Sequence, residues 1–173
     1  KYIDFLNIMT YDFYNGLHKV NGHHSNFRPS AQPDLDMNSV VAAIDMHINA
    51  GFPAGKINLG IPFYGRIWEG VKSDNEQILF QEAETVGMGI DYINFVKNIN
   101  ANGFTRFWDD SAKAPYLWNP VEKTFISYED EESIQYKIEY LKEKGLAGVM
   151  FWEYSADNDK VLLDAVTKNL HKK

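Results

Sequence analysis

Cysteine is absent from all 173 residues of this sequence. The protein therefore has no disulfide framework and no thiolate ligands for zinc or redox chemistry, although this absence leaves its compartment open. Long apolar runs are absent too, so no segment predicts a bilayer-spanning helix. The first residues, Lys1 and Tyr2, show neither an initiator methionine nor the pattern of a signal peptide. We therefore expect the chain to be a piece of a longer protein.

Positively charged residues are fewer than negatively charged ones. The sequence has 17 lysines and arginines against 24 aspartates and glutamates, so its formal net charge is 17 − 24 = −7. This balance argues against nucleic acid or an anionic membrane surface as the main partner. Apolar and aromatic residues, by contrast, are plentiful at 45% and 14%. A chain of this length and composition can bury one sizeable core, or a core plus a small subdomain.

Strand and helix patterns alternate at both ends of the chain. The predicted strands are 2–10, 56–63 and 147–152, and the predicted helices are 39–50, 133–144 and 157–170. Asn38 or Ser39 is the candidate N-cap of the first helix, and Gly51 and Gly145 stand where the first two helices are expected to end. Such alternation predicts an α/β fold with a parallel sheet.

The middle of the chain breaks this rhythm. Between residues 65 and 127 the sequence predicts short aromatic strands at 104–108, 116–118 and 124–127, and one short helix at 92–98. We interpret this stretch as a small α+β module inserted between the second strand and its helix. The predicted organisation is therefore a first α/β segment over 1–64, an insertion over 65–127 and a second α/β segment over 128–173.

Tyr11 and Asp12 stand at the end of the first predicted strand, just before a loop rich in glycine, asparagine and histidine. Chemistry in parallel α/β proteins is usually located at the carboxyl ends of the strands. A phenol and a carboxylate at such a place can orient a substrate amide or share a proton. The alternative is a capped strand end with Tyr11 half buried, and the pair alone does not decide between the two.

The two other predicted parallel strands end in the same way. Tyr64 and Arg66 follow the second, and Trp152 and Glu153 follow the third. Aromatic rings flanked by hydrogen-bonding groups suit sugars, whose C–H faces stack on rings and whose hydroxyls and amides need directional partners. The alternative, that these rings only pack the top of the core, is weakened because three successive strands repeat the pattern. The expected ligand is thus a carbohydrate.

With these motifs the sequence resembles glycoside hydrolase family 18, the chitinases, over essentially its whole length. Met9-Thr10-Tyr11-Asp12 is similar to the family's sixth barrel strand, and Gly148-Val149-Met150-Phe151-Trp152-Glu153 to the eighth. The other matching segments are Gly22-His23-His24-Ser25, Leu59-Gly60-Ile61-Pro62-Phe63-Tyr64-Gly65-Arg66, Gly87-Met88, Trp108-Asp109-Asp110, Lys113-Ala114-Pro115-Tyr116-Leu117 and Ile126-Ser127-Tyr128-Glu129-Asp130. The resemblance implies the C-terminal part of a (β/α)8 barrel, with three parallel strands and an α+β insertion domain.

The resemblance also implies roles for single residues. Tyr11 would hydrogen-bond the acetamide of the sugar in the −1 subsite, with Asp12 beside it in a supporting catalytic role, and Trp152 would form the floor under that sugar. The implied substrate-binding set is Met9, Tyr64, Arg66, Met88 and Trp152. The implied substrate is chitin or chito-oligosaccharides, the implied setting is secreted or extracellular, and the substrate's own acetamide would act as the nucleophile.

One element of the family is absent, namely its catalytic Asp-x-x-Asp-x-Asp-x-Glu strand. The nearest string, 31–38, contains Asp34 and Asp36 but has Ala31 for the first aspartate and Asn38 for the acidic glutamate. An amide cannot protonate a leaving group, and we interpret the two aspartates as charges of a loop and a helix start. The chain alone is therefore predicted to be inactive, and to need an N-terminal half of the barrel or to self-associate.

Two alternatives stay open at this point. The intact protein could be a non-catalytic chitin-binding relative, a chitinase-like lectin, because the deciding acid would lie outside this chain. A purely structural role of the aromatic residues is the second. His18, His23 and His24 suggest a metal site, but one loop of histidines without positioned carboxylates is weak support for it, so we expect neither a metal nor a cofactor.

Overall fold

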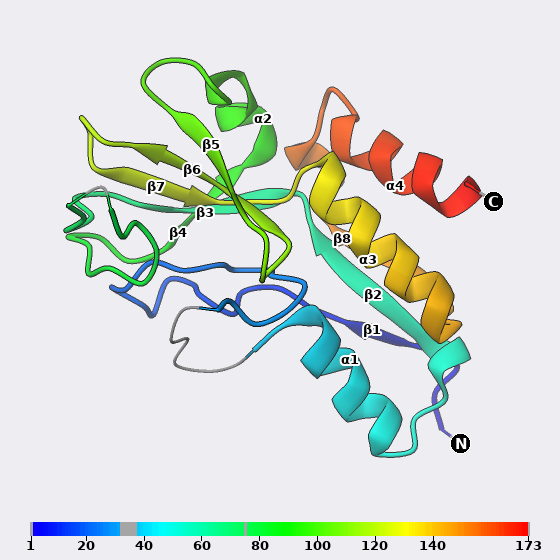
Figure 1. Ribbon diagram of the computed structural model, residues 1–173. Helices are drawn as coiled ribbons and strands as arrows, with labels where there is room; N and C mark the ends of the chain where they lie inside the picture. Colours follow the sequence, from blue (N-terminus) through cyan, green and yellow to red (C-terminus); the bar gives the residue numbers. More distant parts are fainter. Residues whose placement is uncertain (1, 32–37, 75, 173) are drawn as a thin grey trace.

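The computed structural model describes residues 2–31, 38–74 and 76–172, and two sheets are present in these segments (Figure 1). The first is parallel, with the order β1-β2-β8, and consists of β1 (Leu6–Ile8), β2 (Ile57–Pro62) and β8 (Gly148–Trp152). The second is antiparallel, with the order β4-β3-β7-β6-β5. Its strands are β3 (Tyr64–Trp68), β4 (Met88–Asp91), β5 (Thr105–Asp109), β6 (Ala114–Asn119) and β7 (Thr124–Ser127).

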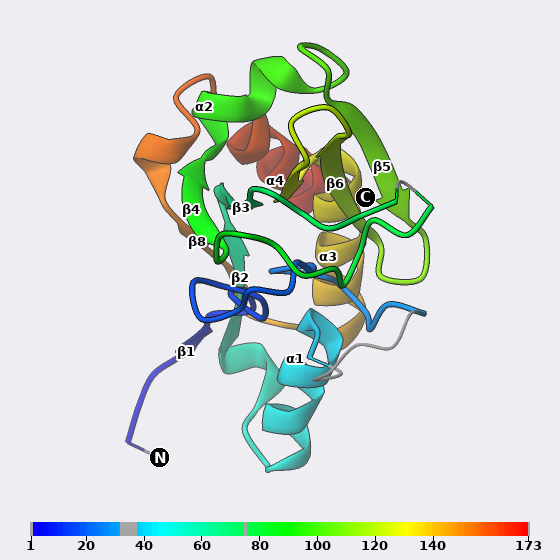
Figure 2. The same ribbon diagram turned by 90° about the vertical axis from the view of Figure 1, so that its left-hand side faces the viewer.

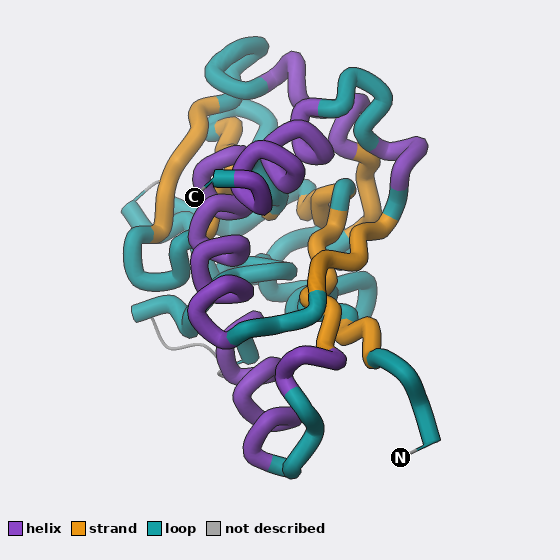
Figure 3. The backbone as a smooth tube through the Cα atoms, turned by 90° about the vertical axis from the view of Figure 1, so that its right-hand side faces the viewer, coloured by secondary structure: helices purple, strands orange, loops and turns teal. Residues whose placement is uncertain are grey.

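The helices belong mostly to the parallel sheet. They are α1 (Val40–Asn49), α2 (Tyr92–Phe95), α3 (Glu131–Lys144) and α4 (Val161–His171), with 3-10 turns η1 (Ala54–Lys56), η2 (Val96–Asn98) and η3 (Tyr154–Ala156). Figure 3 shows α1, α3 and α4 on one side of the parallel strands. In Figure 2, which is turned toward the insertion, β1 and α1 lie below the antiparallel sheet. None of the helices in the described residues is long and apolar enough to cross a membrane.

The core follows from the sequence pattern of the central strand. Ile57, Leu59 and Ile61 of β2 are completely buried, as is expected of a parallel strand with neighbours on both sides. They belong to one apolar cluster with Ile44 of α1 and Ile138 of α3. This packing fixes the carboxyl ends of β1, β2 and β8 beside one another, since β2 pairs in register with both of the other strands.

Helix ends were predicted well where a cap residue is local. Ser39 caps α1 by accepting a hydrogen bond from the backbone N–H of Ala42, and Gly145 ends α3 in the left-handed conformation with φ 64°. The start of α3 is earlier than predicted, at Glu131, because Asp130 caps it and Ser133 completes a capping box.

Two expectations about elements were wrong, and two strands were missed. The first strand, predicted over 2–10, is limited to Leu6–Ile8, where the register with β2 holds it. The last helix starts at Val161 rather than at Asp157, whose carboxylate instead accepts hydrogen bonds from the backbone N–H groups of 161–163. Strands β3 and β4 were not predicted, since their residues alternate poorly between buried and exposed.

Candidate active site

A cleft of about 360 Å³ lies at the carboxyl ends of the parallel strands. It is formed by the ends of β1, β2 and β8 together with β3 and β4 of the antiparallel sheet. Its lining residues are Asp12, Tyr64, Arg66, Gly89, Ile90, Asp91, Trp152, Glu153 and Ala156. The three strand ends that the sequence singled out therefore do meet at one place, and they bring aromatic rings and charged groups together there.

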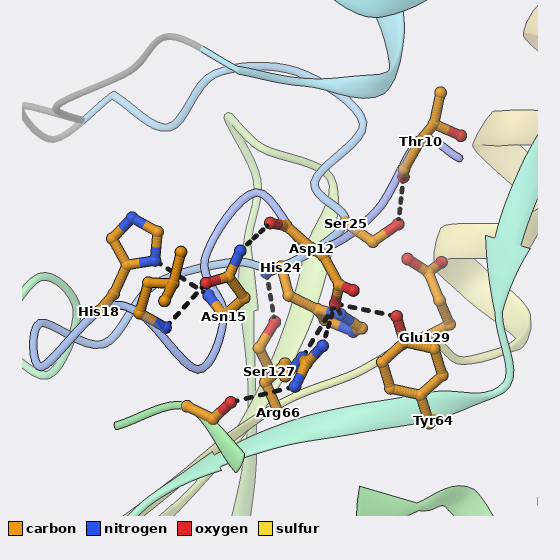
Figure 4. Close-up of polar contacts among 12 residues, drawn as sticks. Thr10, Asp12, Asn15, His18, His24, Ser25, Tyr64, Arg66, Ser127 and Glu129 are labelled. Atoms are coloured by element: carbon orange, nitrogen blue, oxygen red, sulfur yellow. Dashed lines mark hydrogen bonds and ion pairs between the residues drawn. The ribbon is translucent and has the colours of Figure 1, made fainter. Parts of the chain in front are cut away.

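Asp12 is the most heavily engaged charged residue of this cleft (Figure 4). Its Oδ1 accepts hydrogen bonds from the Tyr64 hydroxyl at 2.9 Å, from Arg66 Nε at 2.9 Å and from Arg66 Nη2 at 2.7 Å. Within the described residues no hydrogen bond reaches Oδ2. The carboxylate is thus held by one oxygen, while the other is left for a ligand in the cleft.

These contacts determine the charge of the carboxyl group. Burial alone would raise the pKa of Asp12, but its contacts with His24, Arg66 and Tyr64 outweigh burial and lower the pKa to about 2. Burial, and then the negative charge of Asp12, raises the pKa of Tyr64. At neutral pH the pair is therefore a carboxylate and a neutral phenol, which suits hydrogen bonding to a sugar and not proton donation by Asp12.

The backbone after β1 turns sharply to place Asp12 in the cleft. Asp12 has φ 63°, a left-handed conformation that aspartate and asparagine adopt more readily than most residues. Asn15 stabilises this turn, because its Nδ2 donates to the Asp12 carbonyl at 2.9 Å and its Oδ1 accepts from the Leu17 N–H at 2.9 Å. Figure 4 shows both contacts of Asn15 beneath Asp12.

Tyr11 lies under the cleft rather than on its wall, with 9% of its surface exposed. Its ring passes over β2 at Gly60, where any Cβ atom would meet the Ile8 carbonyl oxygen at 2.4 Å and the Tyr11 ring at 3.1 Å. Among the described residues the Tyr11 hydroxyl donates only to the sulfur of Met150, at 3.9 Å, and a thioether is a weak acceptor. Burial raises the pKa of Tyr11, as does the charge of Asp12, so its hydroxyl keeps a proton that it can donate to a ligand.

Trp152 and Glu153 form the side of the cleft at the end of β8. Trp152 is 58% exposed, which is unusual for so large an apolar side chain, and its carbonyl accepts a hydrogen bond from the Phe63 N–H at 2.6 Å. The peptide bond between Trp152 and Glu153 is cis. The ring is therefore anchored through its backbone while its surface stays open to a ligand.

The predicted site residues do not all line the cleft. Met9 and Met88 are 68% and 57% exposed, and neither belongs to the lining residues. Asp91 is a lining carboxylate that the sequence did not single out, and the signal for it is weak. It stands at the end of β4, a strand that was itself not recognised.

Each of the three loop histidines has its own surroundings, and no group of metal-ligating residues occurs within the described residues. His18 Nδ1 accepts a hydrogen bond from the Asn15 N–H at 3.2 Å. His23 Nε2 lies 3.2 Å from Asp109 Oδ2 in the insertion. His24 is fully buried behind Asp12. The aspartates Asp34 and Asp36 lie outside the described residues.

Comparisons with known proteins agree on one family. The model of the family "Glycosyl hydrolases family 18" matches residues 1–157. Chitinase A1 of Niallia circulans is 42% identical over an alignment of 181 positions, which covers 97% of this chain and 26% of that protein. Chitinase B of Serratia marcescens is 30% identical over 90% of this chain and 41% of its own length. The chain thus spans less than half the length of these relatives.

A solved structure gives the same result for the fold. A glycoside hydrolase family 18 N-acetylglucosaminidase from Paenibacillus barengoltzii superposes with a TM-score of 0.90 and 43% identity, over 98% of this chain and 49% of that one. The chain therefore has the fold of part of a (β/α)8 barrel with an α+β insertion, as its sequence predicted. A chitinase from Cycas revoluta, solved in complex with (GlcNAc)3, has a TM-score of 0.85 at 25% identity, covering 96% and 47% of the two chains.

Proposed function

Because the chain belongs to glycosyl hydrolases family 18, we propose that it forms one wall of the substrate cleft of a chitinase. The intact protein would hydrolyse β-1,4-linked N-acetylglucosamine polymers with retention of configuration. The observation that carries this proposal is the Asp12 carboxylate, which Tyr64 and Arg66 hold through Oδ1 while no other described residue hydrogen-bonds Oδ2, in the same cleft as the exposed ring of Trp152. A ring face beside a fixed hydrogen-bonding group is the arrangement that a pyranose with an acetamide requires.

The proposed reaction uses the acetamide of the substrate as its nucleophile, so no enzymic carboxylate attacks carbon. The acetamide oxygen would bond the anomeric carbon as the glycosidic bond breaks, and water would then open the resulting ring. Tyr11 would donate its hydroxyl proton in a hydrogen bond to the acetamide oxygen, and Asp12 Oδ2 would lie beside it. Fixing the acetamide in this way lowers the barrier by orientation and by stabilising developing charge.

The general acid would come from outside this chain. Asp12 is ionised at neutral pH, and Asn38 carries an amide that cannot protonate a leaving group. We therefore propose that the isolated chain does not hydrolyse chito-oligosaccharides and that an N-terminal half of the barrel completes the site. Release of product by homogeneous 173-residue protein would contradict this, and Asp91 or Glu153 of the cleft would then be the candidate acids.

The remaining parts of this proposal concern organisation and setting. The domain boundaries that we propose are 1–64 and 128–173 for the barrel and 65–127 for the insertion, since the antiparallel sheet begins at Tyr64 and ends at Ser127. A secreted or extracellular enzyme is proposed from the family and from the polymeric substrate.

The experiment compares Tyr11→Phe with Trp152→Ala in the full-length protein that contains this chain. Tyr11→Phe should lower kcat by ~10²–10³, because a positioned donor acts mainly on the transition state. Trp152→Ala should raise KM as well as lower kcat, because a stacking floor serves substrate and transition state alike. Tyr136→Phe on α3 removes a hydroxyl away from the cleft and is the control. A kcat of Tyr11→Phe within a few-fold of the control would refute the role of Tyr11.

The same protein also decides between an enzyme and a lectin. Hydrolysis of chito-oligosaccharides by the wild type supports the proposal, whereas binding without hydrolysis would identify a chitin-binding protein. A full-length protein that neither binds nor hydrolyses chito-oligosaccharides would refute a carbohydrate function for this cleft.

A further inference from the structure

The loop after β1 contains a segment of seven consecutive residues, 21–27, that are all buried although most of them are polar. The segment reads Asn-Gly-His-His-Ser-Asn-Phe, and apart from the glycine none of its residues is more than 5% exposed. Buried polar groups are costly unless they are paired. The partners of this segment therefore indicate what holds it in place.

The segment is held from two directions. On one side, His23 Nε2 lies 3.2 Å from Asp109 Oδ2 of β5, in the antiparallel sheet. On the other, Lys137 Nζ of α3 donates to the Ser25 carbonyl at 2.6 Å and to Ser25 Oγ at 2.8 Å. Ser25 Oγ in turn donates to the Thr10 carbonyl at 2.9 Å, one residue before Tyr11. The residue between these two anchors is His24.

Lys137 is itself part of a fully buried ion pair. Its ammonium group contacts Glu129 Oε1, and Glu129 Oε2 accepts a hydrogen bond from Ser133 at 2.8 Å. Lys137 and Glu129 are 0% and 2% exposed. An ion pair of this kind contributes little net stability over apolar residues of the same size, but it gives Ser25 a fixed position that an apolar contact would not.

His24 is the one member of the segment that faces the cleft carboxylate. It is fully buried, its Nδ1 is 3.8 Å from Asp12 Oδ1, and its ring centroid is 5.4 Å from that of Tyr64. The backbone fixes it, since its N–H donates to Ser127 Oγ at 3.0 Å and its carbonyl accepts from the Phe13 N–H at 3.1 Å. Within the described residues neither ring nitrogen makes a hydrogen bond.

Burial keeps the ring of His24 neutral. Burial lowers the pKa of His24, and the contact with Asp12 and the negative charge of Glu129 oppose it without outweighing it, while the positive charge of Lys137 adds a smaller lowering. A neutral imidazole still carries one N–H, and Asp12 Oδ1 is the acceptor that faces Nδ1. Contacts of this length in a site without ligand often shorten to hydrogen bonds when substrate binds.

We propose that His24 is a positioning residue that holds Asp12 for the sugar through its Nδ1–H. The three hydrogen bonds to Asp12 Oδ1 all come from one strand, β3. His24 approaches the same oxygen from the loop after β1, and so adds a contact from a second direction. Oδ2 then points at one place in the cleft. This inference rests on the proposed function, because Asp12 is taken to act on a bound sugar.

The test uses the full-length protein and three variants, His24→Asn, His24→Gln and His24→Phe. Asparagine places an N–H near the position of Nδ1, glutamine places it near Nε2, and phenylalanine keeps the ring without any N–H. Glutamine and phenylalanine should lower kcat by on the order of 10- to 100-fold with KM within about two-fold, because a misplaced group acts on the transition state. Asparagine should recover most of the loss. His47→Phe on α1, outside the cleft, is the matched control.

The pH profile gives a second readout that a merely structural role would not move. Loss of a donor to Asp12 raises the pKa of its carboxyl group, so the acidic limb of kcat/KM should move to higher pH in the glutamine and phenylalanine variants and stay in place in the asparagine variant. Melting temperatures of the asparagine and glutamine variants separate this effect from unfolding, since both side chains are polar and similar in size.

The outcomes separate this inference from the proposed function. Wild-type protein that neither binds nor cleaves chito-oligosaccharides would refute both. With a functional wild type, equal kcat values and acidic limbs for asparagine and glutamine variants would overturn the role of Nδ1, as would a kcat for His24→Gln within two-fold of the control. If the wild type binds without cleaving, the same comparison is made with Kd, and the same asymmetry between asparagine and glutamine is expected.

Discussion

The two sheets of this molecule complete their hydrogen bonding in different ways. In the antiparallel sheet, β3, β7, β6 and β5 follow one another as neighbours, and their partners lie within 65 residues of sequence. In the parallel sheet, β2 pairs on both sides, but β1 and β8 have no second neighbour within the described residues. The antiparallel sheet has edge strands too, β4 and β5, but three of its five strands have neighbours on both sides, whereas only one of the three parallel strands does within the described residues.

The apolar clusters follow the same division. The antiparallel sheet has a cluster of its own around Trp68, Trp118 and Phe125, which Tyr14 from the loop after β1 joins. The larger cluster extends from the helices over β2 into the insertion, where it includes Phe95, Leu117 of β6 and Ile126 of β7. β1 contributes little to it, and its flanking residues Phe5 and Met9 are 58% and 68% exposed. The comparison teaches that the two parts differ in how many of their strands have two neighbours, and not only in their apolar clusters.

The largest expected effect concerns the isolated 173-residue chain. Because open edges and exposed apolar residues favour association, the chain should self-associate, and amide hydrogens of β1 and β8 should exchange much faster than those of β6. Light scattering and hydrogen exchange measure this. A cooperatively melting monomer with β1 and β8 as protected as β6 would abolish the distinction between the two sheets.

A second prediction tests the buried ion pair between Lys137 and Glu129, through which α3 contacts the loop after β1. Lys137→Met in the full-length protein should lower the free energy of unfolding by ~3–5 kcal/mol, because it leaves Glu129 buried without a counter-charge. Lys144→Met on the same helix removes a half-exposed pair with Asp45 and should cost less than ~1 kcal/mol. Denaturant unfolding compares the two.

The double variant Lys137→Met/Glu129→Gln sharpens this test. It should be more stable than Lys137→Met alone, since no unpaired charge remains. Equal losses for Lys137→Met and Lys144→Met would show that the buried pair does not anchor the loop.

A third prediction concerns acid stability at the contact between insertion and loop. Burial opposes ionisation of Asp109, but contacts with His23, Ser111 and Ser30 outweigh it and hold its pKa well below its usual range. Since the folded pKa is below the unfolded value of about 3.9, the stabilisation is complete above that value and is lost as the pH falls from there toward the folded pKa. Asp109→Asn should therefore flatten the acid limb of stability below about pH 4.

Thermal unfolding between pH 2 and pH 7 measures this limb, with the exposed Asp159→Asn as the control. An acid limb as steep in Asp109→Asn as in the control would indicate that the insertion is not tied to the loop through this carboxylate.

The smallest effect is expected at the cap of α1. Ser39→Ala should lower the free energy of unfolding by ~1 kcal/mol, because the Ala42 N–H loses its acceptor. Ser39→Gly should cost only a few tenths of a kcal/mol, since glycine leaves that N–H accessible to water. Equal losses for the two variants, measured by denaturant unfolding, would contradict the capping role.

Predictability from the sequence depends on how local the signal is, and not on the sheet. Ser39, Gly145 and the central strand β2 were predicted because their signals are local, a cap, a left-handed glycine and an alternating apolar run. The short extent of β1 was not, because it depends on a register with β2 that lies about 50 residues away. Strands β3 and β4 were missed as well, since their residues alternate poorly and β3 pairs with β7 about 60 residues away.

The site shows the same limit. Asp12, Tyr64 and Trp152 could be assigned to one place because each follows a parallel strand, and such ends share an edge. His24 and Asp91 could not be assigned to this site, because nothing in the sequence around them indicates that they lie close to Asp12. His24 was noticed only as a member of a histidine-rich loop, and the structure alone separates it from His23, which faces the insertion.

The open ring of Trp152 has an optical consequence. Trp68 and Trp118 are almost completely buried, at 0% and 2% exposure, whereas Trp152 is 58% exposed at the edge of the cleft. Among the four tryptophans of the chain, an aqueous collisional quencher therefore reaches Trp152 first, and Trp108, which is partly buried, after it. A sugar stacked on the Trp152 ring would shield it from the quencher, so the quenchable fraction of the emission becomes a natural gauge of cleft occupancy that needs no attached dye.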